Sequence, residues 1–283
     1  MSLTSERLRG SYGLWIDGKE VEAKDWSYLK NPATGEKLTK VAEGTESDMN
    51  RAIESAKNAF DDGRWSKMEA RDRAKVLTRA AEILRSRIPR MAALETLQTG
   101  RTIREYVAQL GRIPDWFDYH AALSQTIEGN LPPFSDPDHH CYVKRVPLGV
   151  CGLVTSWNHP LLISNKKISV ALAAGNTVVV KPPPPAPCSI LEMADILREA
   201  GLPDGVLNVV PSSTAGPVLT SHKDVVKVDL TGGTETGQKI GASAGAQVKH
   251  YTAELGGNAA VMVFDDVSSV DNAVNGVTFA AYV

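Results

Sequence analysis

The chain has 283 residues, of which 42% are hydrophobic, so it can bury a core large enough for one large domain or two ordinary ones. Its 31 Lys and Arg residues nearly balance its 33 Asp and Glu residues, and no long block of one sign occurs, which argues against a nucleic-acid partner. The three cysteines are too few and too irregularly spaced for a disulfide framework or a metal site, so we expect no metal.

The chain also lacks the signals of export and membrane insertion. Residues 1–10 contain no apolar core of signal-peptide length, and no uncharged apolar run approaches the roughly eighteen residues that span a bilayer. We therefore expect a cytoplasmic protein with free thiols and no membrane partner.

The N-terminal half begins with turns and continues with helices. Asp-Gly and Asn-Pro turns in residues 13–35 are typical of an antiparallel lead-in of short strands. Apolar residues then recur at helical spacing over residues 47–60, and a second helix buries the stripe Leu77, Leu84 and Ile88. Pro89 predicts a break in that second helix before it resumes and ends at Gly100.

Residues 129–138 are rich in turn formers and lead into residues 140–146, which we expect to form an exposed strand. After Pro147 strands and helices alternate. The expected strands are 150–155, 176–181, 206–210, 225–230, 249–255 and 259–264, and the expected helices are 166–174, 186–200 and one from about 235. This order predicts an α/β fold, a Rossmann-like open parallel sheet with helices on both faces.

A nucleotide would bind at the strand ends of such a sheet. The usual fingerprint of three closely spaced glycines is absent, and TGGTETG at residues 231–237 stands between a strand and a helix instead. Taken alone, this segment is equally well explained as a glycine turn.

Several segments in order carry a more specific signal. They are NPATG at 31–35, ETLQTG at 95–100, PLGVCGLVTSWNHP at 147–160, ALAAGNTVVVKP at 171–182, AGLPDGVLNVVP at 200–211, TGGTETG at 231–237 and ELGG at 254–257. Together they resemble the NAD(P)-dependent aldehyde dehydrogenase superfamily over nearly the whole chain.

The resemblance implies oxidation of an aldehyde to a carboxylic acid through a cysteine thiohemiacetal, with hydride transfer to nicotinamide and hydrolysis of the thioester. It makes Asn158 the donor to the oxyanion, Glu254 the general base, and Lys167 a lysine that supports proton transfer near that glutamate. Without the family pattern, Asn158 would more simply cap a helix and Glu254 would be a surface carboxylate.

The cofactor that the resemblance implies is NAD or NADP. Lys181 would contact the adenosine ribose, Gly232 and Gly233 would admit the pyrophosphate, and Trp157 would line the cofactor channel, unless it is a core tryptophan. The residues assigned to cofactor binding are Val154, Thr155, Ser156, Trp157, Lys181, Pro183, Gly216, Thr231, Gly232, Gly233, Thr236, Leu255 and Gly256.

Some positions depart from the family pattern. Pro184 stands where many relatives carry a ribose-binding glutamate, which leaves the choice between NAD and NADP open. Gly233 replaces a common serine, and His159 and Lys166 replace aromatic residues, so the aldehyde itself is not indicated.

The family nucleophile is expected a few residues beyond Val283, and the apolar neighbours of Cys151 suggest a packed thiol with a raised pKa. We therefore expect the N-terminal, cofactor-binding portion of the enzyme, truncated before the catalytic cysteine. The alternatives are a naturally truncated, catalytically inactive dinucleotide-binding or interaction protein, and a non-functional product.

The resemblance divides the chain into four parts. We predict that 1–128 is the N-terminal part of the cofactor-binding domain, 129–147 an oligomerisation hairpin, 148–257 the Rossmann-like NAD(P)-binding domain, and 258–283 the start of a largely missing catalytic domain. When complete, the enzyme would be a homodimer or homotetramer. Val270, Val274 and Val277 lie on one face of an expected terminal helix, which the missing domain would cover.

Overall fold

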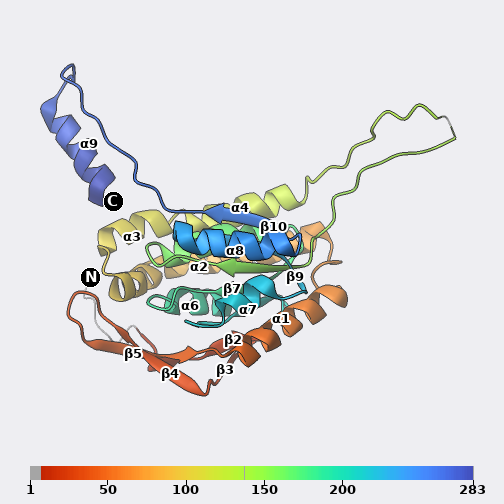
Figure 1. Cartoon of the computed structure of the whole chain (residues 1–283), viewed down its shortest axis with the longest axis horizontal. Coiled ribbons are helices and arrows are strands. Elements are labelled where there is room, and N and C mark those ends of the chain that lie inside the picture. Colours follow the sequence, from red (N-terminus) through yellow and green to blue (C-terminus); the bar gives the residue numbers. More distant parts are fainter. Residues whose placement is uncertain (1–7, 137, 283) are drawn as a thin grey trace.

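The fold is built on a seven-stranded sheet with the strand order β10-β9-β6-β7-β8-β2-β3. The computed structural model describes residues 8–136 and 138–282 (Figure 1). The expectation that residues 1–10 carry no signal peptide falls mostly on residues 1–7, which lie outside the described residues.

The centre of this sheet is parallel, as predicted. Its parallel strands are β6 (Val150–Val154), β7 (Thr177–Lys181), β8 (Leu207–Val209), β9 (Val225–Thr231) and β10 (His250–Glu254). The β6, β7 and β8 strands are almost entirely apolar and buried because helices cover both of their faces. From β6 the chain adds β7 and β8 on one side and then returns to add β9 and β10 on the other.

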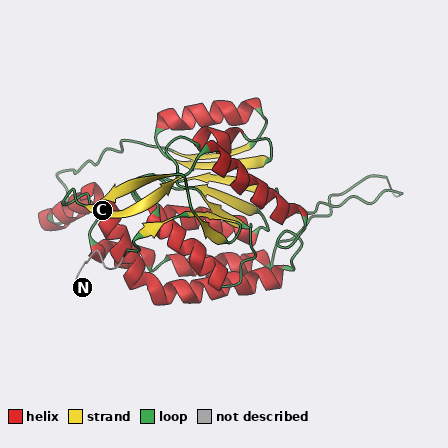
Figure 2. Ribbon diagram, turned by 90° about the horizontal axis from the view of Figure 1, so that it is seen from below, coloured by secondary structure: helices red, strands yellow, loops and turns green. Residues whose placement is uncertain are grey.

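Helices lie on both faces of the sheet, as Figure 2 shows. On one face α5 and α6 pack against the strands, and α2, α3 and α4 pack outside them, while α1, α7 and α8 cover the other face. The helices are α1 (Glu46–Asp61), α2 (Ala70–Thr99), α3 (Ile103–Leu110), α4 (Ile113–Ser124), α5 (Pro160–Ala173), α6 (Cys188–Glu199), α7 (Gly216–Ser221) and α8 (Thr234–Ala246).

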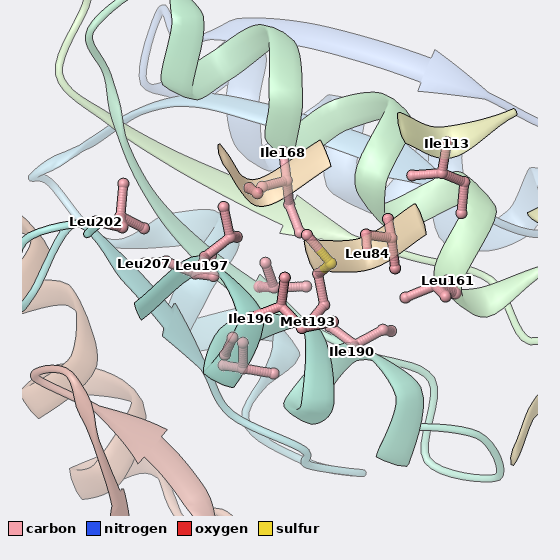
Figure 3. Packing of buried hydrophobic residues seen from close by; sticks show 14 of the residues in the cluster. Leu84, Ile113, Leu161, Ile168, Ile190, Met193, Ile196, Leu197, Leu202 and Leu207 are labelled. Carbon is pink, nitrogen blue, oxygen red and sulfur yellow. The ribbon is translucent and has the colours of Figure 1, made fainter. Parts of the chain in front are cut away.

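The alternation of side chains along each strand creates two separate apolar clusters. Cys151 and Leu153 of β6 face the cluster under α2, α5 and α6, whereas Val150 and Val154 face the cluster under α1 and α7. Figure 3 shows the first cluster, in which Met193 of α6 lies between Leu84 of α2 and its neighbours on α5 and α6.

The antiparallel lead-in is part of the main sheet. Strands β2 (Leu14–Ile16) and β3 (Lys19–Val21) form a hairpin, and Trp15 pairs with Val209 of β8. At the hairpin turn Asp17 has φ 55° and Gly18 has φ 73°, the left-handed pair that a tight two-residue turn requires. A smaller sheet contains β1 (Ser11–Tyr12), β5 (Lys37–Glu43) and β4 (Asp25–Lys30) in that order.

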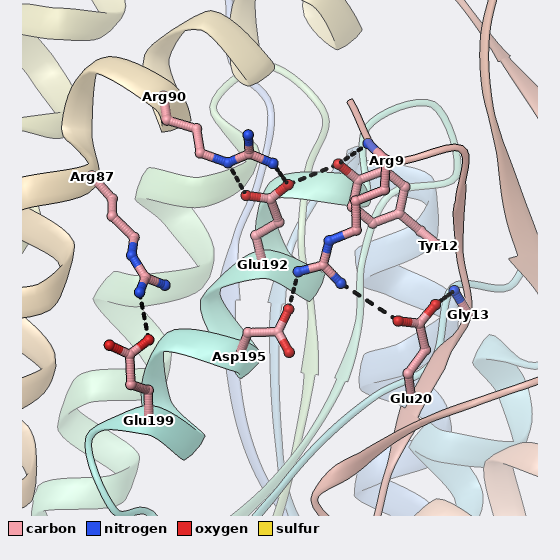
Figure 4. A network of polar contacts seen from close by, with 9 residues as sticks. All are labelled: Arg9, Tyr12, Gly13, Glu20, Arg87, Arg90, Glu192, Asp195 and Glu199. Carbon is pink, nitrogen blue, oxygen red and sulfur yellow. Dashed lines mark hydrogen bonds and ion pairs between the residues drawn. The ribbon is translucent and has the colours of Figure 1, made fainter. Parts of the chain in front are cut away.

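A polar network fastens the N-terminal segment to α6 and α2 (Figure 4). Arg90 of α2 makes two parallel hydrogen bonds to Glu192, at 2.9 and 2.7 Å, and the Tyr12 hydroxyl donates to the same carboxylate at 2.8 Å. Arg9 forms an ion pair with Asp195. The Glu192 carboxylate is 7% exposed, and its contacts with Arg90 and Tyr12 tie α6 to α2 and to β1, which are far apart in sequence.

The predicted helix break at Pro89 is wrong, because α2 runs unbroken from Ala70 to Thr99 with Pro89 inside it. Proline removes one hydrogen bond within a helix. Here Leu84, Ile88 and Met91, on both sides of the proline, are buried, and this packing outweighs the local cost.

Two predicted strands are absent from the described residues. Residues 259–264 form no strand, and residues 140–146 contribute only one isolated antiparallel bridge, between Val143 and Asn130. Both segments extend from the body in Figure 1, so neither lies beside a strand of the main sheet.

The terminal helix α9 (Val270–Tyr282) also lies away from the sheet (Figure 1). Its Val270 and Val274 are 70% and 56% exposed, as expected for a face that nothing in the chain covers. The division into segments at residues 128, 147 and 257 stays a prediction.

We predict that Leu84→Ala lowers the free energy of unfolding by about 2–5 kcal/mol, because Leu84 is fully buried between two layers of helices. Leu123→Ala on α4, where the side chain is 44% exposed, is the matched control and should cost less than about 1 kcal/mol. Urea denaturation of both variants measures the difference, and equal losses would contradict this view of the core.

Candidate functional site

The strand order reverses between β6 and β9, and in an open α/β sheet ligands bind at the carboxyl end of such a reversal. The register places the last residues of four strands along this one edge: Val154 pairs with Lys181 and Leu230, and Thr231 pairs with Glu254. The structure thus brings together residues that are 100 positions apart in the sequence.

The loop from β6 to α5 begins buried and becomes exposed. Thr155 is 5% exposed, its N–H donates to the Lys181 carbonyl at 3.4 Å, and its Oγ1 accepts a hydrogen bond from Ser164 at 3.2 Å. Trp157 is 62% exposed, so the alternative of a core tryptophan is wrong.

Asn158 is held at both its side chain and its backbone. Ser156 Oγ donates to Asn158 Oδ1 at 2.7 Å, and the Tyr106 hydroxyl donates to the Asn158 backbone oxygen at 3.3 Å. The N-cap of α5 is His159, so Asn158 is not the helix cap. The Asn158 amide nitrogen has no acceptor among the described residues, which leaves its N–H groups available to a ligand.

Lys181, at the end of β7, is largely buried. Its Nζ donates to the backbone oxygens of Pro182 and Ser212, each at 3.1 Å, and burial lowers the pKa of Lys181 to about 8. Its stem passes Gly216, where an added Cβ would lie 3.4 Å from Lys181 Cδ. Pro183 is buried beside it, whereas Pro184 is exposed.

The turn from β9 to α8 is open. Gly233 is the N-cap of α8 and provides no side-chain hydrogen bond to the first turn, and a Cβ added there would meet nothing within 4 Å. Gly232 donates to the Glu254 backbone oxygen at 3.0 Å, which joins this turn to the end of β10. Thr236 is exposed in the first turn of α8.

The residues after β10 return toward the same turn. Leu255 packs against Gly237, where an added Cβ would lie 2.4 Å from Leu255 Cδ2, and a Cβ at Gly256 would lie 3.8 Å from Thr234 Oγ1. Gly237, the last glycine of TGGTETG, therefore leaves room for the Leu255 side chain.

Glu254 and Lys167 do not contact each other. Glu254 is exposed at the end of β10, and within the described residues its carboxylate makes no hydrogen bond or ion pair. Lys167 is buried on α5 and forms an ion pair with Asp229 of β9. Asp229 pairs in register with Thr252, two residues before Glu254.

The cysteines offer no activated thiol at this edge. Burial raises the pKa of Cys151 to about 12, as its apolar neighbours predicted, and burial also raises the pKa of Cys188 well above its ordinary value. Cys141 is exposed in the segment 140–146, which extends from the body in Figure 1.

The edge fits a dinucleotide. The uncapped N-terminus of α8 presents backbone N–H groups and a partial positive charge, the space at Gly233 admits a phosphate group, and Lys181 adds an ammonium group at the end of β7 on the same edge of the sheet. Over residues 8–136 and 138–282, no group of three or more His, Cys, Asp and Glu side chains could hold a metal ion, and no helix is both long and apolar enough to cross a membrane.

Two buried residues near Asn158 were not identified from the sequence. Glu95 and Tyr106 are both fully buried and reach the start of α5 from α2 and α3. The only sequence signal was the family-like segment ETLQTG, which contains Glu95 but says nothing of its contacts.

Comparison with known proteins points to one family. The model described as "Aldehyde dehydrogenase family" matches residues 15–283. A betaine aldehyde dehydrogenase of Bacillus subtilis (strain 168) is 39% identical over 278 residues, which cover 96% of this chain and 57% of that protein.

Solved structures agree. An aldehyde dehydrogenase from Bacillus cereus, solved as an NAD+ complex, has a TM-score of 0.90 and 33% identity, over 94% of this chain and 55% of that one. A betaine aldehyde dehydrogenase from Staphylococcus aureus, also with NAD+, has a TM-score of 0.92 and 35% identity, over 96% and 56%. The chain thus spans just over half the length of these relatives.

The lowered pKa of Lys181 predicts a dependence of stability on pH. Below pH 8 the ammonium is charged in both states and its burial is unfavourable, whereas between pH 8 and 10.5 only the unfolded chain keeps the proton, so stability rises with pH. Relative to Lys181→Met, the wild type should gain up to about 3 kcal/mol over this range.

Urea denaturation at several pH values measures this gain. Lys239→Met, at a side chain that is 74% exposed on α8, is the control and should change stability by less than about 1 kcal/mol. If the difference in the free energy of unfolding between wild type and Lys181→Met does not vary with pH, the lowered pKa of a buried Lys181 amine is refuted.

Proposed function

The chain belongs to the aldehyde dehydrogenase family, and from this premise we propose that it supplies the NAD(P)-binding part of an enzyme that oxidises an aldehyde to a carboxylic acid. The observation that carries the proposal is the single edge at which β6, β7, β9 and β10 end beside the open N-terminus of α8. The relatives solved with NAD+ support a nicotinamide dinucleotide as the cofactor.

Two groups of this edge would hold the cofactor. Lys181, fixed by the carbonyls of Pro182 and Ser212, would bind the ribose, and Gly232 and Gly233 would leave room for the pyrophosphate at α8. The exposed Trp157 would flank the same channel. When bound, the cofactor supplies a hydride acceptor.

The proposed catalytic groups lie at the same edge. Because Ser156 occupies the Asn158 oxygen, the Asn158 amide presents N–H groups, which suit an oxyanion. Glu254 is proposed as the general base that takes a proton from water, since its carboxylate is open to solvent. The ion pair of Lys167 with Asp229 would place a positive charge one strand away from Glu254.

The nucleophile is proposed to be a cysteine outside this sequence. Cys151 and Cys188 are buried with raised pKa values, and Cys141 is exposed in the segment 140–146, which extends from the body in Figure 1. A thiolate would add to the aldehyde carbon, that carbon would lose its hydride to the bound dinucleotide, and water would then hydrolyse the resulting thioester, which releases the acid and restores the thiolate. We propose that the complete enzyme works in the cytoplasm as a homodimer or homotetramer, with residues 129–147 as an oligomerisation hairpin.

Cofactor binding by this chain tests the proposal directly. Titration with NAD+ and with NADP+, followed by tryptophan fluorescence, should give saturable quenching because Trp157 lies exposed beside the site. The absence of saturable binding of either dinucleotide would overturn the proposed role of the chain.

We predict that Gly233→Asp raises the Kd for the dinucleotide at least about tenfold while leaving the fold as stable as before. An aspartate at the N-cap would accept hydrogen bonds from the first turn of α8 and repel the pyrophosphate. Gly245→Asp adds the same charge near the other end of α8, where a Cβ also meets nothing within 4 Å, and should leave the Kd within about twofold. Equal Kd values for the two variants would argue against binding at α8.

A further inference from the structure

Helices α5 and α6 both begin without a cap of their own. His159, the N-cap of α5, and Pro187, the N-cap of α6, make no side-chain hydrogen bond to the first turn of their helices. Pro160 has no N–H, so Leu161 carries the first free N–H of α5. Both helix ends are buried, where an unsatisfied N–H is costly.

The last turns of α2 cap both helices from outside. Glu95 Oε2 accepts a hydrogen bond from Leu161 N at 3.4 Å, and Gln98 Oε1 accepts one from Cys188 N at 3.1 Å. Gln98 Nε2 donates to Glu95 Oε1 at 2.7 Å, and Ser189 Oγ donates to the same oxygen. The carboxylate of Glu95 is fully buried with no ion pair within the described part of the chain, so these donors and the helix ends stabilise its charge.

A second contact holds the residues just before α5. The hydroxyl of Tyr106 lies 2.8 Å from Thr99 Oγ1 and donates to the Asn158 backbone oxygen at 3.3 Å. The Tyr106 ring is fully buried and meets the His159 ring edge-on, with their centroids 6.3 Å apart. Thr99 Oγ1 also lies 2.8 Å from the Glu95 backbone oxygen, so Thr99 lies between the two contacts.

We propose that Glu95 and Tyr106 are positioning residues for Asn158: the carboxylate caps the first turn of α5 from α2, and the hydroxyl holds the Asn158 carbonyl from α3. This role rests on the proposed function of Asn158 as the donor to the oxyanion. Between the two contacts lie only His159 and Pro160, so the backbone is held at the Asn158 carbonyl and again at Leu161, in the first turn of α5. An oxyanion donor is effective only when it is held in place before the reaction.

The protonation state of Glu95 gives this arrangement a measurable signature. Burial raises the pKa of Glu95 to about 7, although its hydrogen bonds with Ser189, Leu161 and Gln98 lower it. The titratable and charged groups that face this region are Arg101 before α3, Glu105 and Tyr106 from α3, Cys188 from α6 and His159 at the start of α5, and burial lowers the pKa of His159. A transition near pH 7 that disappears in Glu95→Gln therefore reports Glu95.

The test is nuclear magnetic resonance of this chain, with Glu95→Gln and Tyr106→Phe as variants. The controls are Glu82→Gln, exposed on the same helix α2, and Tyr119→Phe, which is 63% exposed on α4. In Tyr106→Phe we expect the backbone at Asn158 to become mobile, with the order parameter of its backbone amide falling from about 0.85 to below about 0.6. In Glu95→Gln we expect the Leu161 amide to exchange its hydrogen about tenfold faster at pH 8.

A pH series adds a readout that a purely structural role would not change. In the wild type and in Glu82→Gln, the Asn158 side-chain resonance should shift with a midpoint near pH 7, and in Glu95→Gln this transition should vanish while that of His159 remains. If the Asn158 backbone amide keeps its order parameter in Tyr106→Phe, or the transition of the Asn158 side chain near pH 7 persists in Glu95→Gln, the positioning role is refuted.

Failure of the proposed function would look different. Both variants should keep the wild-type Kd for NAD+, because neither residue lies at Lys181 or α8. Loss of dinucleotide binding in the wild type would remove the proposed function, whereas the Asn158 measurements would still decide whether Glu95 and Tyr106 hold that residue.

Discussion

The reversal of strand order between β6 and β9 is the constraint on which the site depends. From β6 the chain continues to β7 and β8 on one side of that strand, whereas β9 and β10 lie on its other side. The loops that follow β6 and β9 therefore lead away from each other and leave an open edge between them. Val154, Lys181, Thr231 and Glu254 are brought together there because the register of parallel strands aligns their carboxyl ends. Side chains drawn from 100 residues of sequence thereby share one surface.

The edge is useful only because the layers behind it are rigid. Apolar clusters fill both faces of the sheet, and the polar contacts of Glu192 with Arg90 and Tyr12 fasten the N-terminal strands to α6. The proposed capping of α5 and α6 by Glu95 and Gln98 extends the same principle toward the site. A buried carboxylate is tolerated there because the N-terminus of α5, the Gln98 amide and the Ser189 hydroxyl donate hydrogen bonds to it.

Local sequence rules failed where packing or pairing decides the outcome. Proline signals a helix break, yet buried residues on both sides of Pro89 keep α2 continuous. Residues 259–264 have the composition of a strand but no neighbour to pair with, so they stay extended and exposed. For Lys167, the family pattern suggested a position near Glu254, and the structure pairs it with Asp229 on the intervening strand.

The sequence alone determined the class of the fold, the alternation of strands and helices after Pro147, and the residues at the strand ends, because apolar periodicity and glycine turns are local properties. It also predicted a packed Cys151 from its neighbours. Only the tertiary structure decided that β2 joins the main sheet, that Lys181 is buried between two backbone carbonyls, and that Glu95 and Tyr106 meet the segment after Asn158. Apart from the hydrogen bond of Lys181 to its neighbour Pro182, these contacts join residues 31 to 194 positions apart, and no local pattern encodes which distant partner will complete a hydrogen bond.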